Sequence, residues 1–177
     1  MEYVVGILAV IVIVVYVVRS AGAGASRIGG KLKGDSTDEE MKRLAAAARL
    51  AAKKEYRLDL THDRASISDL ENEIMQDLHH NQLITPYPEE ELTELSRLWG
   101  AYVGEILRRV RAGIWQSRSR HGDRRPMPFV LDRNHEVFPC SWVYRRIKHG
   151  PEYSVHRKAC EFADNRDNPK YALKGEE

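Results

Sequence analysis

Two cysteines and two histidines late in the chain could ligate a metal ion. Cys140, His149, His156 and Cys160 form the pattern C-x8-H-x6-H-x3-C, and thiolate and imidazole groups are the usual zinc ligands. The spacing matches no common zinc module and lacks a C-x2-C pair. Buried thiols and surface histidines explain the same residues, so we assign no metal ligand and no cofactor. A hydrolase or metal-dependent enzyme using Glu105, His156 and Cys160 remains an alternative.

Glu105 is the carboxylate with the clearest surroundings, because arginines follow it on the same predicted helix. Arg108 and Arg109 lie three and four residues further on, a spacing that favours ion pairs on a helix. Arg145 and Arg146 could also reach it from a later helix. A catalytic carboxylate would need a second carboxylate or a nucleophile in a defined relation to it, and the sequence provides none. We therefore expect a structural ion pair and assign no catalytic residue.

A basic loop is predicted at residues 117–125. Arg118, Arg120, His121, Arg124 and Arg125 lie there among small polar residues. Such a loop could bind anionic lipid headgroups or an acidic protein partner, or it could simply be solvated. Aromatic residues for stacking on bases are not interleaved, so nucleic acid is not an expected partner.

Helical periodicity and capping signals define the elements that would position these groups. A first helix is predicted over residues 36–58, with capping-box spacing between Ser36 and Glu39. A second is predicted over residues 66–84, with a capping box of Ser68 and Glu71. Its buried face is expected to comprise Ile67, Leu70, Ile74 and Leu78.

The third predicted helix, residues 88–112, is the longest and should be central. Trp99, Tyr102 and Ile106 are expected to be buried on one face. Gly100 and Gly104, four residues apart, should let another element approach the helix backbone closely.

Short strand-like runs follow, and then two more helices. The segments GIWQ, PFVLD and EVF predict two or three antiparallel strands. Helices should begin near Pro139 and Pro151, with Gly150 ending the first of them. The order of elements predicts an α+β domain, in which helices pack on a short antiparallel sheet.

The N-terminal residues predict a membrane anchor. Residues 3–18 carry no charge, and Tyr3, Tyr16 and Arg19 suit the membrane interfaces. Lys and Arg residues follow this run and do not precede it, which favours an uncleaved span over a signal peptide and a cytoplasmic location for the rest of the chain. We predict a transmembrane signal anchor at 1–19, a flexible linker at 20–35, a helical arm at 36–60, a globular domain at 61–165 and a polar tail at 166–177.

Charge is strongly segregated along the chain, although the net formal charge is +2. Residues 35–95 carry 15 acidic and seven basic residues, a balance of −8. Residues 106–150 carry 11 basic and three acidic residues, a balance of +8. We expect the two halves to neutralise each other within one domain.

Residues 92–155 resemble an uncharacterised bacterial domain. The shared pattern is G-x-Y-x-G-E, then G-x-W, then P-x-x-x-V-x-[KR]-R-[IL]-x-x-G. It falls on Gly100, Tyr102, Gly104, Glu105, Trp115, Pro139, Val143, Arg146, Ile147 and Gly150. The resemblance implies a shared fold and no established activity.

The sequence as a whole favours a binding function over a catalytic one. We expect a single-pass protein of the bacterial inner membrane, with its N-terminus outside and a cytoplasmic domain that binds an unknown protein. An immunity or accessory role would suit such a module. A structural, oligomerising membrane protein is the other alternative.

Overall fold

A computed structural model describes residues 36–119, 127–131 and 135–164 of the 177-residue chain. The predicted anchor and linker, and the polar tail, lie outside the described residues. The chain divides into two compact units, residues 1–36 and 37–177. Apart from the first residue of helix α2, every element below belongs to the second unit.

Helix α2 (Ser36–Ala51) continues into a single wider helical turn, η1 (Ala52–Tyr56), as the first predicted helix requires. Its inner face is made of small or unbranched residues, which allow close helix packing. These are Met41, Leu44, Ala45, Ala48 and Ala52, all buried. The helix ends where Arg57 adopts a left-handed conformation, with φ of 58°, a common helix terminator.

The second predicted helix forms as one continuous run of α3 (Arg64–Asp69), η2 (Leu70–Met75) and α4 (Gln76–Ile84). Its predicted face of Ile67, Leu70, Ile74 and Leu78 is buried.

The predicted capping box of Ser68 and Glu71 is wrong. The helix starts earlier, and the carboxylate of Asp63 accepts a hydrogen bond from the Ser66 N–H at 2.8 Å. That bond, with others from Thr61 and the Ser66 hydroxyl, lowers the pKa of Asp63 to about 2.

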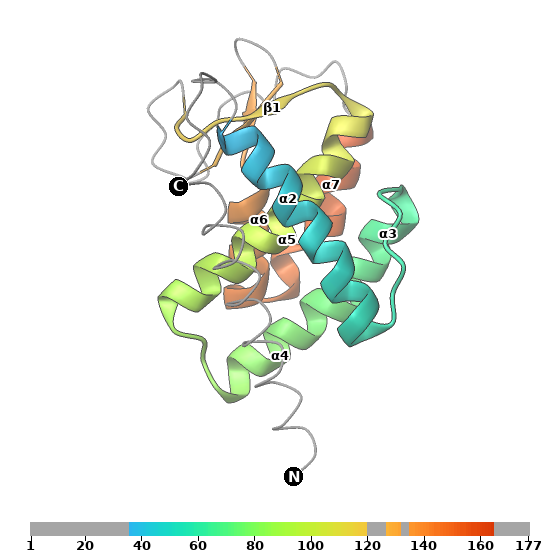
Figure 1. Ribbon diagram of the computed structural model, residues 1–177. Helices are drawn as coiled ribbons and strands as arrows, with labels where there is room; N and C mark the ends of the chain where they lie inside the picture. The colour runs from blue at the N-terminus through green and yellow to red at the C-terminus, as the bar shows by residue number, and fades with distance from the viewer. Residues whose placement is uncertain (1–35, 120–126, 132–134, 165–177) are drawn as a thin grey trace. The chain divides into compact units, whose positions relative to one another are not determined.

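Helix α5 (Glu89–Val110) is the central helix, and α6 (Pro139–His149) packs along it (Figure 1). Trp99, Tyr102 and Ile106 are buried, as predicted. Gly100 and Gly104, here the glycine stripe, allow the predicted close approach of other elements to the backbone of α5. A Cβ at Gly100 would lie 2.5 Å from the Cα of Cys140 on α6, so only glycine permits this crossing.

The sheet has three antiparallel strands of two residues each, in the order β1-β2-β3. They are β1 (Ile114–Trp115), β2 (Phe129–Val130) and β3 (Glu136–Val137), with Trp115 opposite Phe129 and Phe129 opposite Val137. Such short strands depend on the packing of their side chains on the helices, and Phe129 is fully buried.

The chain closes with η3 (Pro151–Tyr153) and α7 (Val155–Asp164), so both proline-initiated segments form. Gly150 joins α6 to η3 with φ of 120°, a conformation that side chains other than glycine rarely adopt. The predicted α+β class with a small antiparallel sheet is confirmed.

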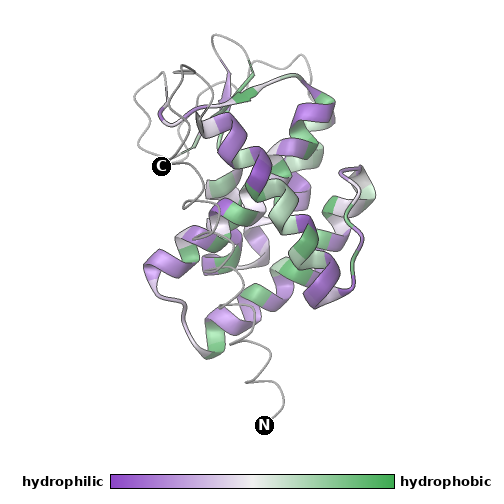
Figure 2. Cartoon of the chain, in the orientation of Figure 1, coloured by the Kyte–Doolittle hydropathy of each residue, from purple (hydrophilic) through white to green (hydrophobic). Residues whose placement is uncertain are grey.

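The described helices carry both polar and apolar residues (Figure 2). Within the described residues, no helix combines the length and the apolar character needed to cross a membrane.

Candidate functional site

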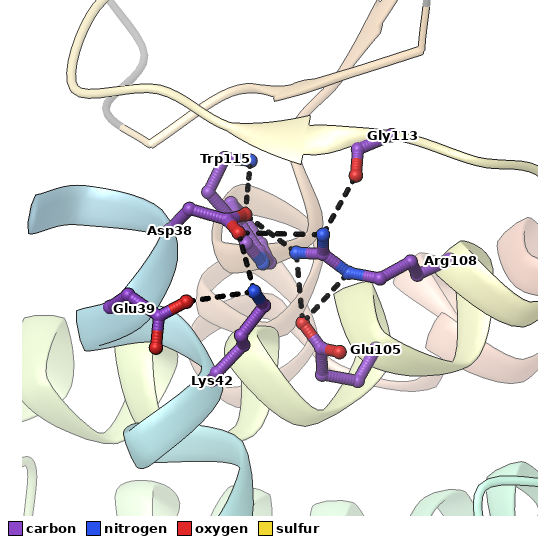
Figure 3. Close-up of polar contacts among 7 residues, drawn as sticks. All are labelled: Asp38, Glu39, Lys42, Glu105, Arg108, Gly113 and Trp115. Carbon is purple, nitrogen blue, oxygen red and sulfur yellow. Dashed lines mark hydrogen bonds and ion pairs between the residues drawn. The ribbon is translucent and has the colours of Figure 1, made fainter. Parts of the chain in front are cut away.

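A polar cluster joins α2, α5 and β1 (Figure 3). The carboxylate of Asp38 accepts hydrogen bonds from Nη2 of Arg108 at 2.6 Å and from the backbone N–H of Trp115 at 2.9 Å. Lys42 Nζ lies 3.0 Å from the same carboxylate. The first turn of α2 is thereby fastened to the end of the central helix and to the first strand.

Arg108 is the centre of this cluster. Its guanidinium also donates to the carbonyl oxygen of Gly113 at 2.8 Å and lies 3.1 Å from the carboxylate of Glu105. Its Cζ is 5.4 Å from the centroid of the Phe129 ring, within the range of a cation–π contact. The arginine thus links two carboxylates, a backbone carbonyl and the sheet.

The electrostatics of the cluster favour its charged form. Burial by itself raises the pKa of Asp38, but hydrogen bonds from Arg108, Trp115 and Lys42 outweigh it, and the pKa is lowered. Burial also opposes the charge on Arg108, yet Asp38 and Glu105 raise its pKa. Because each charged group is matched by another, the cluster acts as a structural clamp.

Glu105 pairs with Arg108, one of the partners that its spacing predicted. Its carboxylate accepts from the Arg108 Nε at 3.2 Å. Within the part of the chain that the structure describes, no nucleophilic side chain contacts the Glu105 carboxylate, which is paired instead with the Arg108 guanidinium. The geometry therefore supports the structural role of Glu105.

The other motif residues also serve packing. Trp115 lies against Gly104, and Tyr102 is fully buried, with its hydroxyl accepting a long 3.3 Å hydrogen bond from the His62 N–H. Arg146 is buried and donates from Nε to Glu71 at 2.5 Å. These motif residues thus pack α5, β1 and α6 against one another and against the segments that precede α5.

Glu71 has a role that the sequence did not reveal. Its second carboxylate oxygen accepts from the backbone N–H groups of Val155 and His156, at 2.8 and 3.1 Å, where α7 begins. A carboxylate at this position satisfies free N–H groups and suits the positive end of the helix dipole. With Arg146, it ties three helical segments together.

The possible metal ligands do not converge. Cys140 is buried beneath Gly100, and burial raises the pKa of its thiol to about 12, which disfavours the thiolate that binds metals. Cys160 Sγ lies 3.5 Å from His156 Nε2, while the ring of His149 packs at a tilt against the ring of Tyr153. Among the described residues, no three His, Cys, Asp or Glu side chains are grouped as a metal site requires.

The predicted basic loop is described only at its edges. Arg118 is exposed, whereas Arg120, His121, Arg124 and Arg125 lie outside the described residues. At the near edge, the Ser119 hydroxyl donates to the buried carboxylate of Glu136 on β3 at 2.5 Å.

One exposed apolar feature was missed by sequence reasoning. Residues 83–88, here the α4–α5 elbow, expose Leu83 and Ile84 to 67% and 66%. The elbow is held by backbone hydrogen bonds. Thr85 N–H donates to the Asn81 carbonyl, and Tyr87 N–H donates to the Gln82 side-chain oxygen, both at 2.8 Å. The two side chains are therefore presented by an ordered turn.

Comparison of the chain with models of protein families, with curated proteins and with solved structures found no match. The described residues thus contain two internal clamps of paired charges, one around Asp38 and Arg108 and one around Glu71 and Arg146. They also contain an ordered apolar elbow on the surface.

Proposed function

We propose that this chain is a single-pass, membrane-anchored module that binds another protein through the α4–α5 elbow. The observation that carries the proposal is the exposure of Leu83 and Ile84 next to each other on an ordered turn. Adjacent large apolar side chains that remain in water are a common mark of a docking surface.

The surroundings of the elbow indicate the character of the partner. Asp77 in the first turn of α4 is exposed, and so is Glu90 in the first turn of α5. Tyr87 adds a half-buried aromatic ring between them. An apolar centre with an acidic rim fits a partner that presents apolar side chains flanked by Lys or Arg.

The anchoring half of the proposal rests on the N-terminal sequence. The uncharged run at residues 3–18 is followed by Arg19, Arg27, Lys31 and Lys33, and positive residues close to a span stay on the cytoplasmic side. We place the protein in an inner membrane with its N-terminus outside and the elbow in the cytoplasm. An immunity or accessory role fits such a module.

Site-specific photo-crosslinking tests the binding half. The full chain, in membranes of its native cells, would carry a photoreactive residue at position 83 or, as the matched control, at position 50. Leu50 is equally exposed, at 71%, but lies on α2. We expect a discrete product with one other protein from position 83 and none from position 50.

Ile84→Ser tests whether the apolar contact holds the partner, and it should abolish the crosslink from position 83. No product from position 83, or a product that contains only a second copy of the chain, would contradict binding to another protein.

A C-terminal alkaline phosphatase fusion tests the anchoring half, because this enzyme is active only outside the cytoplasm. We expect an inactive fusion. An active fusion, or a mature protein that starts near Ala23 or Gly24, would contradict the proposed topology.

A further inference from the structure

The outward side of α2 and η1 carries basic side chains around one large apolar residue. We call it the α2 basic face, and its members are Arg43, Leu50, Lys53, Lys54 and Arg57, all exposed. Leu50 is 71% exposed, the highest value among the large apolar residues of the described chain. The opposite side of the same helix is fully engaged with the core.

Of the four cations of this face, only Lys54 forms an ion pair with a residue that the structure describes. Lys54 lies 3.4 Å from the carboxylate of Glu55. Among the described residues, Arg43, Lys53 and Arg57 have no ion-pair partner. A set of free cations on one side of a helix leaves a positive field that a ligand can neutralise.

Neighbouring segments extend the same field. Arg49 donates from Nε to the Leu60 carbonyl at 2.7 Å, and Arg109 donates from α5 to the Thr61 carbonyl at 3.3 Å. Both guanidiniums lie close to His62, whose pKa is lowered first by burial and then by these two positive charges. Two further cations therefore lie beside the loop at residues 57–62, which also carries the exposed Asp59.

We infer that the α2 basic face is a contact surface for anionic phospholipid, with the Leu50 side chain at the boundary between headgroups and acyl chains. Exposed Lys and Arg around an apolar residue are the composition of helices that lie in the membrane interface, and basic clusters are attracted to anionic headgroups. This composition favours lipid over an acidic protein, whose binding would not need an exposed Leu at the centre.

The position of α2 in the chain supports the same occupant. This inference rests on the proposed anchor, which ends near residue 19, whereas α2 begins at residue 36. A fully extended connection over residues 20–35 spans at most about 55 Å. The first helix of the domain is thus confined to the neighbourhood of the bilayer, where weak electrostatic attraction suffices to bring it into contact.

Spin-label accessibility in the full chain tests the inference. A nitroxide would be placed by Leu50→Cys or, as the matched control, by Leu83→Cys, in both cases with Cys160→Ser. The protein would be reconstituted into liposomes of phosphatidylcholine, alone or mixed with phosphatidylglycerol. We expect the label at position 50 to lose access to a water-soluble nickel complex and to gain access to oxygen, in the mixed liposomes only. The label at position 83 should remain in water in both.

A charge variant separates electrostatic attraction from mere proximity. Arg43→Gln, Lys53→Gln and Lys54→Gln together should return the label at position 50 to water in the mixed liposomes, and high salt should do the same. The control, Lys148→Gln with Arg157→Gln, removes two exposed cations on α6 and α7 and should leave the label in lipid. Thermal unfolding of each variant verifies that the domain is folded.

A label at position 50 that stays in water in the mixed liposomes would overturn the inference. So would a photo-crosslink from position 50 to an acidic protein. Failure of the proposed anchor has a different signature, since the chain would then be extracted from membranes by alkaline carbonate. In that case, salt-sensitive flotation with the mixed liposomes, lost in the triple variant, would still support the lipid surface, and absence of flotation would overturn it.

Discussion

The indole ring of Trp115 lies directly against the backbone of the central helix at Gly104. A Cβ atom at position 104 would lie 2.0 Å from Cζ2 of the ring. On its other side, Trp115 meets Phe129 edge to face, with ring centroids 5.3 Å apart. The small sheet is thereby held on α5 by one aromatic side chain seated over one glycine.

Gly104→Ala should therefore destabilise the domain. In an exposed helix this change stabilises by about 1 kcal/mol. Here the added methyl group meets a packed ring, and overpacking of a core costs about 1–3 kcal/mol. We expect a lower free energy of unfolding, measured by urea denaturation of the fragment 36–177. The double variant with Trp115→Phe should be less destabilised than the sum of the two single changes. Strict additivity would show that the ring and the methyl group do not collide.

Asp38→Asn should weaken the clamp and reduce the acid sensitivity of the domain. Loss of the charged hydrogen bonds to Arg108 and Trp115 should cost about 1–3 kcal/mol at neutral pH. Since the folded pKa of Asp38 lies below its ordinary value of 3.8, its stabilising effect is complete well above pH 3.8. That effect is lost as the pH falls through the folded value.

The difference in unfolding free energy between the native chain and Asp38→Asn should accordingly shrink below about pH 4. Urea unfolding from pH 7 to pH 3 measures it. A difference that does not change with pH would mean that Asp38 is not held as an anion.

Ile106→Ala should cost about 2–5 kcal/mol, since it deletes a buried aliphatic side chain. Leu50→Ala is the matched control, because Leu50 is exposed and its truncation should change the unfolding free energy by less than about 0.5 kcal/mol. Thermal unfolding of the fragment 36–177 compares the two. Equal melting temperatures for the two variants would refute the assignment of the buried face of α5.

Changing Arg118, Arg120, Arg124 and Arg125 together to Ser should leave the melting temperature nearly constant, because the sequence predicts a solvated loop and exposed ion pairs contribute about 0–1 kcal/mol. It should weaken, in a salt-sensitive way, binding to an acidic partner or to anionic vesicles. If this variant unfolds, the arginines of the loop are needed for the stability of the fold. Unchanged binding in a folded variant would remove the loop from the functional surface.

Local pattern predicted the helices well, because their signals lie within a few residues. The periodicity of α5 and the prolines that begin α6 and η3 are examples. The glycine stripe was also predictable, since a spacing of four residues on a helix has a direct geometric meaning. The partners in the two clamps were not. Glu71 meets Arg146, 75 residues away, and Asp38 meets Arg108, 70 residues away.

The exposed elbow was unpredictable for a related reason. Leu83 and Ile84 look locally like the last turn of a buried helix. Only the packing of the whole domain leaves them uncovered. Candidate surfaces of this kind thus require the structure, whereas the residues of the resemblance motif could be traced to their elements from the sequence.

The Asp38 clamp also has a mechanical consequence. Asp38 is the third residue of α2, so tension applied from the N-terminal side reaches the bonds to Arg108 and Trp115 almost at once. Those bonds join α2 to the C-terminal end of the central helix α5 and to the sheet. They must break before α2 can separate from the domain. In a pulling experiment with handles at residues 36 and 164, Asp38→Asn should lower the force of the first unfolding event. Tension on the N-terminal side is thus resisted by a latch at the first turn of the domain.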